Sequence, residues 1–157
     1  DMMKSTPGFN HKMSEMHAAV GRHSLARLDG VLSRRRQYGA RLRAFLSDEV
    51  GEDFALQKVP DDQRPNQQNL AVLWNRTEPV DVDDVIAALA EQGVQGRRYF
   101  WPMLHQLEMF GGRFSLPVTE RVSSRLLCLP MHSRMSEETL SRVEEAVRAM
   151  AARLGSR

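Results

Sequence analysis

The chain has 157 residues, of which 41% are hydrophobic and 27% charged, with a formal net charge of +2 and a single cysteine, Cys128. This length is typical of one domain, and no apolar run approaches the roughly 18 residues of a membrane-spanning helix. A lone cysteine excludes an internal disulfide and a cysteine-rich metal site. The first residues lack the apolar core of a signal peptide, so we expect a cytoplasmic protein without a membrane span.

The first third of the chain is predicted to be mainly helical. Ser14 is placed to cap a helix, because its hydroxyl can accept a hydrogen bond from a first-turn amide. From Ser14 to about Leu46, apolar residues recur at steps of three and four, which predicts one long helix. We expect a kink or break at Asp29-Gly30, because glycine weakens a helix by about 1 kcal/mol relative to alanine. The residues just before Ser14 approach a helix N-terminus, where amides and dipole favour an anion such as phosphate.

The predicted strands lie in the remaining two thirds of the chain. The stretch 47–69 is polar and punctuated by glycine and proline, which indicates a loop with at most a short strand within 54–59. Short apolar runs between turn residues predict strands at 70–74, 95–100 and 126–129.

Three helices are predicted among these strands. Asp81 and Asp84 have the spacing of a capping box, and Gly93 is placed to end the helix that they begin. A short helix is predicted at 117–124, and Ser136 is predicted to cap the last helix, whose apolar residues form one stripe. This order of helices and short strands predicts an α+β domain with a small antiparallel sheet covered by helices.

Three stretches together carry a family pattern, in the expected order. They are Gly-Phe-Asn-His-Lys-Met-Ser-Glu-Met-His-Ala-Ala-Val-Gly at 8–21, Arg-Arg-Tyr-Phe-Trp-Pro-Met-Leu-His at 97–105 and Leu-Leu-Cys-Leu-Pro-Met-His at 126–132. They resemble the sugar aminotransferases of the DegT/DnrJ/EryC1/StrS family, pyridoxal-phosphate enzymes of the aspartate aminotransferase fold. The resemblance covers almost all of this chain but only the C-terminal part of the family's chain. It implies a cofactor-proximal loop and interdomain helix at 1–46, followed by the small C-terminal domain of a fold-type I aminotransferase at 47–157.

The resemblance also implies roles for five residues. Asn10 matches the family asparagine that contacts the pyridoxal phosphate bound in the other subunit, and Lys12 matches the basic residue near the active-site mouth. His105 matches a histidine on the sugar side of the pocket, where Tyr99 and Trp101 would shape the wall. Without the resemblance, Asn10 would be interpreted as a turn residue, Lys12 as a solvated charge and His105 as a surface or structural histidine. Trp101 replaces the tyrosine of many members, which bears on the sugar preference.

None of the lysines matches the one that holds the coenzyme in the family. The chain has only Lys4, Lys12 and Lys58, and the family's lysine belongs to a large domain upstream of the first motif. The resemblance therefore implies the C-terminal part of an enzyme that moves an amino group from an amino acid, usually glutamate, to a keto-sugar, with nucleotide-linked sugars favoured. We expect it to contain no catalytic residue and to be inactive alone, with the large domain, a second copy in a homodimer and the sugar substrate as partners. The alternative is a stand-alone domain without catalysis that serves dimerisation or regulation.

Two other ligand classes are disfavoured. His11, His17 and His23 recur at a spacing of six, which scatters them around a helix, so we expect no metal site. A nucleic-acid-binding module is a remote alternative, suggested by five arginines in the first predicted helix: Arg34, Arg35, Arg36, Arg41 and Arg43. It is disfavoured because 20 acidic residues are interspersed along the chain and no aromatic residues alternate with these arginines to form a stacking platform.

Overall fold

The computed structural model describes residues 12–76, 80–110 and 114–155. The chain divides into two compact units, 1–31 and 32–157, and each is described by itself. The predicted division into 1–46 and 47–157 concerns the domains of the complete protein, and it remains a prediction.

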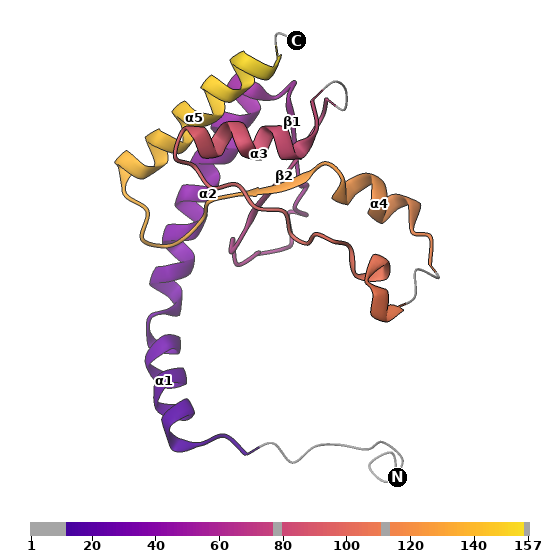
Figure 1. The fold of residues 1–157 in the computed structure, drawn as a ribbon. Helices are drawn as coiled ribbons and strands as arrows, with labels where there is room; N and C mark the ends of the chain where they lie inside the picture. Colours follow the sequence, from indigo (N-terminus) through magenta and orange to yellow (C-terminus); the bar gives the residue numbers. More distant parts are fainter. Residues whose placement is uncertain (1–11, 77–79, 111–113, 156–157) are drawn as a thin grey trace. The chain divides into compact units, whose positions relative to one another are not determined.

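The first unit contains α1, Glu15–Ala26, and the first residues of α2, Leu28–Val50 (Figure 1). Ser14 caps α1 as predicted, because its hydroxyl accepts a hydrogen bond from the amide of His17 at 3.3 Å. None of the α1 residues is buried. Among the described residues of this unit, the exposed large apolar side chains are Met13, Met16, Val20, Leu25 and Leu28.

The helical segment is interrupted at Arg27, so the prediction of a break at Asp29-Gly30 is wrong. The amide of Arg27 donates to the carbonyl of Ser24, only three residues back, at 3.2 Å. This tighter bond interrupts the regular pattern of bonds to the fourth preceding residue. The amide of Val31 instead bonds to the carbonyl of Arg27 at 3.1 Å, and this bond spans Gly30. Gly30 therefore lies within a regular turn of α2.

The second unit is built on a three-stranded antiparallel sheet in the order β1-β2-β3. The strands are β1, Phe54–Leu56, β2, Leu70–Trp74, and β3, Leu126–Leu129, and all three coincide with predicted strands. β2 pairs with β3 so that Leu70 lies opposite Leu129 and Ala71 opposite Cys128. The predicted α+β class with a small antiparallel sheet is thus confirmed.

The prediction of a strand at 95–100 is wrong, because the segment forms only a single β-bridge. Arg97 exchanges two backbone hydrogen bonds with Cys128, at 3.0 and 2.7 Å, and this is the only pairing of the segment with the sheet among the described residues. The chain then turns at 99–100. The side chain of Arg98 bonds to Asp83 in α3 and to the carbonyl of Ser123, outside the sheet.

The remaining described helices all lie in the second unit. They are α3, Val82–Glu91, the short 3₁₀ helices η2, Leu104–Gln106, and η3, Glu108–Phe110, then α4, Pro117–Ser123, and α5, Glu137–Gly155. η2 and η3 were not predicted, whereas α3, α4 and α5 were.

Local sequence signals set both ends of α3 and the start of α5. Asp81 and Asp84 form the predicted capping box, and Ser136 accepts from the amide of Thr139 at 3.1 Å. Gly93 ends α3 with a φ of 75°, a left-handed conformation that favours glycine. The amide of the next residue, Val94, bonds back to Leu89 at 2.9 Å.

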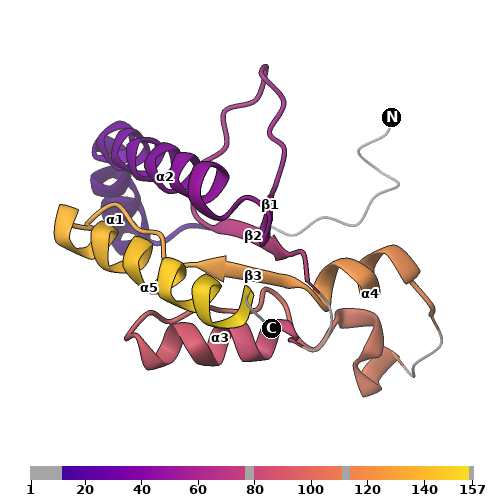
Figure 2. The same cartoon turned by 90° about the horizontal axis from the view of Figure 1, so that it is seen from above.

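One face of the sheet carries the hydrophobic core. Along β2, Leu70, Val72 and Trp74 are buried while the residues between them are half-buried. The buried residues of α2, α3 and α5 join the same core cluster, and Figure 2 shows α5 running alongside both α2 and α3. The opposite face of the sheet carries the site described next. Within the described ranges, no helix is long and apolar enough to span a membrane.

Candidate functional site

A hollow of about 270 Å³ with a mixed polar and apolar lining lies where β2 begins and β3 ends. Arg97 bridges to Cys128, and Cys128 lies opposite Ala71, so these side chains share the face of the sheet away from the core. Gln95 and Tyr99, two residues before and after Arg97, line the same hollow. The hollow is lined by Gln68, Asn69, Gln95, Arg97, Tyr99, Cys128, Leu129, Pro130, Met131 and His132.

The hollow contains hydrogen-bond donors and no carboxylate. Gln95 accepts from the guanidinium of Arg97 at 3.3 Å, and the His132 ring nitrogen Nδ1 accepts from the amide of Arg134 at 3.2 Å. Its floor includes Cys128, which is buried, and burial raises the pKa of this thiol. Cys128 is thus a small buried side chain, as its apolar context indicates.

Of the predicted substrate residues, Tyr99 lines this hollow and Trp101 does not. Tyr99 stacks on Phe100 with ring centroids 5.0 Å apart. The guanidinium carbon of Arg98 lies 3.7 Å from the centroid of the Trp101 ring, a cation–π contact. Arg98 is itself held by Asp83 at 3.0 Å and by the carbonyl of Ser123 at 3.1 Å. Trp101 is therefore positioned by an arginine that is fixed between α3 and the end of α4.

His105 is buried, with 8% of its surface exposed. Its Nε2 lies 3.0 Å from the Glu120 carboxylate, which also accepts from the amide of Leu116 at 2.9 Å. The Leu116 amide, and after it His105, lower the pKa of the Glu120 carboxyl below its usual range. These bonds join η2 to the first turn of α4, and they leave Nδ1 as the ring nitrogen without a partner among the described residues.

The two remaining predicted residues belong to the first unit. Lys12 is exposed, two residues before the cap of α1. Asn10 lies outside the described residues. Tyr99, Trp101 and His105 thus lie in one short segment of the second unit, and Lys12 is not placed relative to them.

Several residues of the site were not predicted as such. Arg97 and Arg98 belong to a recognised motif, but their adjacent guanidiniums point to different partners, Gln95 and Asp83. Gln95, Arg97 and Tyr99 belong to the segment 95–100, whose prediction as a strand was the only sequence signal that could have placed these side chains on one side. His132 follows a strand-ending proline, and its bond to the Arg134 amide agrees with a turn. Among the described residues, no group of histidine, cysteine or acidic side chains could hold a metal ion.

Comparison with known proteins gives a consistent result. The model of the DegT/DnrJ/EryC1/StrS aminotransferase family matches residues 1–148. The chain is 25% identical over 148 residues to the dTDP-4-amino-4,6-dideoxy-D-glucose transaminase of Escherichia coli, covering 91% of this chain and 39% of that protein. It is 30% identical over 151 residues to the dTDP-3-amino-3,4,6-trideoxy-alpha-D-glucose transaminase of Micromonospora megalomicea subsp. nigra, with 91% and 38% covered.

The fold is also shared with solved structures. The structure of DesI in the presence of its TDP-sugar product superposes with a TM-score of 0.80 at 32% identity, covering 99% of this chain and 40% of that one. The chain thus spans about two fifths of the length of the curated relatives it matches.

Proposed function

Because the chain belongs to the DegT/DnrJ/EryC1/StrS aminotransferase family, we propose that it is the C-terminal part of a pyridoxal-phosphate-dependent enzyme that aminates a nucleotide-linked keto-sugar. The observation that carries this proposal is the match of the family model over residues 1–148. The names of the relatives, which are transaminases of dTDP-linked amino sugars, support the class of substrate. The amino donor is an amino acid, with glutamate favoured.

We expect that the described residues do not form a coenzyme site by themselves. A transaminase needs a lysine whose amine binds the coenzyme covalently. Lys12 and Lys58, the two described lysines, are both exposed, and neither matches the family's coenzyme lysine. In the family, an aspartate also pairs with the pyridine nitrogen of the coenzyme. We assign both the coenzyme lysine and this aspartate to an upstream large domain. When bound, the coenzyme would carry the amino group between the two substrates.

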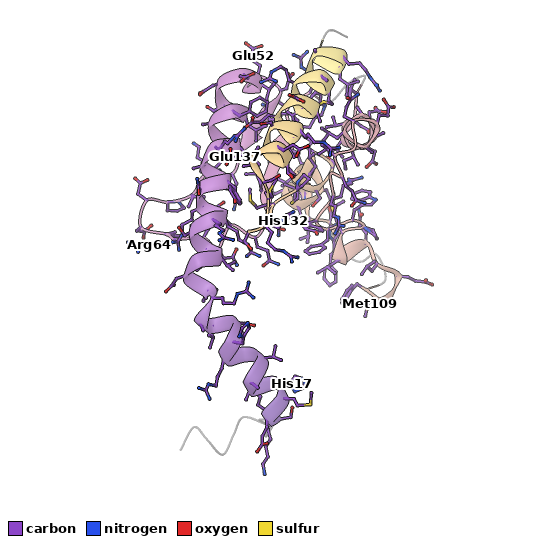
Figure 3. All side chains as sticks on the ribbon, turned by 90° about the vertical axis from the view of Figure 1, so that its left-hand side faces the viewer. His17, Glu52, Arg64, Met109, His132 and Glu137 are labelled. Carbon is purple, nitrogen blue, oxygen red and sulfur yellow. The ribbon has the colours of Figure 1, made fainter. Side chains whose placement is uncertain are left out.

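Exposed apolar surface supports a partner domain and a dimer. In the first unit, α1 buries no residue. In the second unit, the segments 100–110 and 114–118 expose large apolar side chains, with Met109 at 80% and Phe100 at 75%. Figure 3 labels Met109 among them. Contiguous apolar patches of more than several hundred Å² are unusual on monomers and mark interaction surfaces. We assign these surfaces to the large domain and to the second subunit of a homodimer.

The proposed residue roles follow the family motifs. Asn10 contacts the phosphate of the coenzyme in the other subunit, and Lys12 contacts the anionic part of the substrate. Tyr99 and Trp101 form the wall on the sugar side; the contact of Arg98 with the Trp101 ring supports this role, because it fixes the indole in place. His105 reaches the sugar through Nδ1, since Nε2 is held by Glu120.

Covalent labelling tests the assignment of the coenzyme lysine. The 157-residue chain is incubated with pyridoxal phosphate, reduced with borohydride and digested for peptide mapping. We expect no stoichiometric label on Lys4, Lys12 or Lys58, whereas a longer protein that includes the upstream domain should carry one label there and transfer amino groups to a nucleotide-linked keto-sugar. A stoichiometric label on any of the three lysines would contradict the proposal.

A further inference from the structure

The hollow beside β3 presents unpaired positive charge. The guanidinium of Arg97 donates one bond, from Nη2 to Gln95 at 3.3 Å. Its other donors have no partner in the described part of the chain, and none of the residues that line the hollow is acidic. Guanidinium groups bind phosphate and carboxylate through parallel hydrogen bonds. The hollow is therefore suited to an oxyanion.

His132 adds a donor to the same hollow. Its Nδ1 accepts a hydrogen bond from the Arg134 amide at 3.2 Å, so the proton of the neutral ring is on Nε2. His132, labelled in Figure 3, lies three residues after the end of β3. Because His132 lines the hollow, its Nε2–H can donate a hydrogen bond to an anion there.

A second hollow of about 370 Å³ adjoins the first and shares Gln68 and Asn69 with it. It is lined by Arg43 and Lys58 and by no acidic residue. Arg43 donates from Nη1 to the carbonyl of Gln57 at 3.1 Å, while its buried Nε has no partner among the described residues. Positive charge thus lies in both hollows, and amide side chains lie where they meet.

We propose that the two hollows form one binding site, the basic groove, for an elongated molecule that carries two oxyanion groups. The groove is defined by Arg43, Lys58, Gln68, Asn69, Arg97 and His132. The first hollow alone is smaller than the roughly 300–1,000 Å³ of typical ligand pockets, and an elongated ligand would use both. One anionic group lies against Arg97 and His132, and the other against Arg43 and Lys58.

Two sources can supply this chemistry: the diphosphate of a nucleotide and the two carboxylates of a dicarboxylic amino acid. The choice between them rests on the proposed function, whereas the binding of an elongated dianion does not. Failure of the groove and failure of the aminotransferase assignment are distinguishable, because the latter is tested by covalent labelling of lysine.

Isothermal titration calorimetry of the protein tests the groove with thymidine diphosphate, pyrophosphate and glutarate. Arg97→Gln should weaken binding about three- to tenfold, because Arg97 is exposed and solvent screens its hydrogen bonds to an anion, although its guanidinium can make two such bonds. Lys58→Gln, at an exposed position, should weaken binding about two- to fivefold. The matched control is Arg134→Gln, which removes the same charge from an exposed residue near His132 that does not line either hollow, and it should change affinity less than twofold.

The order of affinities for the three probes distinguishes a nucleotide site from a dicarboxylate site. A nucleotide site binds thymidine diphosphate and pyrophosphate more tightly than glutarate, and a dicarboxylate site shows the reverse order. Either order supports the groove if Arg97→Gln and Lys58→Gln both weaken binding and Arg134→Gln does not. The proposal is overturned if none of the three probes binds, or if Arg134→Gln weakens binding as much as Arg97→Gln. If Arg97→Gln unfolds the protein, the effect of Lys58→Gln on binding decides the test. Lys58 suits this purpose because its side chain makes no hydrogen bond or ion pair with another described residue.

Discussion

Replacing Arg41 with methionine should destabilise the second unit more than replacing Arg148 does, although both arginines join α2 to α5. Arg41 forms a two-pronged pair with Glu144, from Nε to Oε1 at 2.7 Å and from Nη2 to Oε2 at 2.8 Å. The side chain of Glu144 is only 16% exposed and that of Arg41 34%. Arg148 pairs with Glu49 at 2.7 Å, but these side chains are 50% and 46% exposed.

The expected magnitudes follow from this difference in exposure. Hydrogen bonds to charged groups contribute about 1.5–3 kcal/mol, and we discount this to about 1–2 kcal/mol because a third of Arg41 is open to solvent and screened. The Glu49–Arg148 pair should contribute no more than about 0.5 kcal/mol, as exposed pairs do. Arg41 also bonds to Glu137 at 2.5 Å and to Ser141 at 3.1 Å, so the single variant should lose more than its pair with Glu144.

Double-mutant cycles isolate each pair. One cycle combines Arg41→Met with Glu144→Ala, and the other combines Arg148→Met with Glu49→Ala, with the free energy of unfolding measured in urea. The contact of Arg148 with the Phe45 ring, at 5.3 Å, cancels within its cycle because Phe45 is unchanged. For a chain of this size, 1 kcal/mol corresponds to a shift of about 2–4 °C in Tm. Coupling energies that are equal in the two cycles, or larger for Arg148 and Glu49, would refute the reasoning from exposure.

Two further predictions concern the site. The Leu116 amide and His105 lower the pKa of Glu120 below the 4.5 of a free glutamate, so its carboxylate stabilises the fold above that pH and this stability is lost as the pH falls through the lowered pKa. Glu120→Gln should therefore flatten the pH dependence of Tm below about pH 4.5, and an unchanged slope would contradict the role of these bonds. In the longer protein, Asn10→Ala should weaken coenzyme binding about ten- to a hundredfold, as expected for one hydrogen bond to a charged phosphate. Mixing a full-length variant that has a crippling substitution at Asn10 with one that lacks the coenzyme lysine should restore activity if each active site is shared by two subunits, whereas no recovery in confirmed heterodimers would mean that Asn10 serves its own subunit or only the local turn.

The sequence by itself determined the elements whose signals are local. The caps at Ser14, Asp81 and Ser136 and the end of α3 at Gly93 depend on residues within one helical turn, and each was predicted. The strands at 70–74 and 126–129 were clear because short apolar runs are bounded by turn residues. The family was recognisable for a related reason, since its three motifs are continuous stretches of chain.

Only the tertiary structure decided which distant residues meet. Whether residues 95–100 form a strand depends on how far they can pair with β3, and one bridge at Cys128 is all that forms before Arg98 binds Asp83. The basic groove gathers α2, the loop before β2, the segment around Arg97 and the loop after β3. No periodicity links these four segments, because their proximity is set by the antiparallel register of β2 and β3 and by packing on the opposite face of the sheet. A sequence pattern reports on neighbours along the chain, whereas a binding site depends on contacts that form only when the core does.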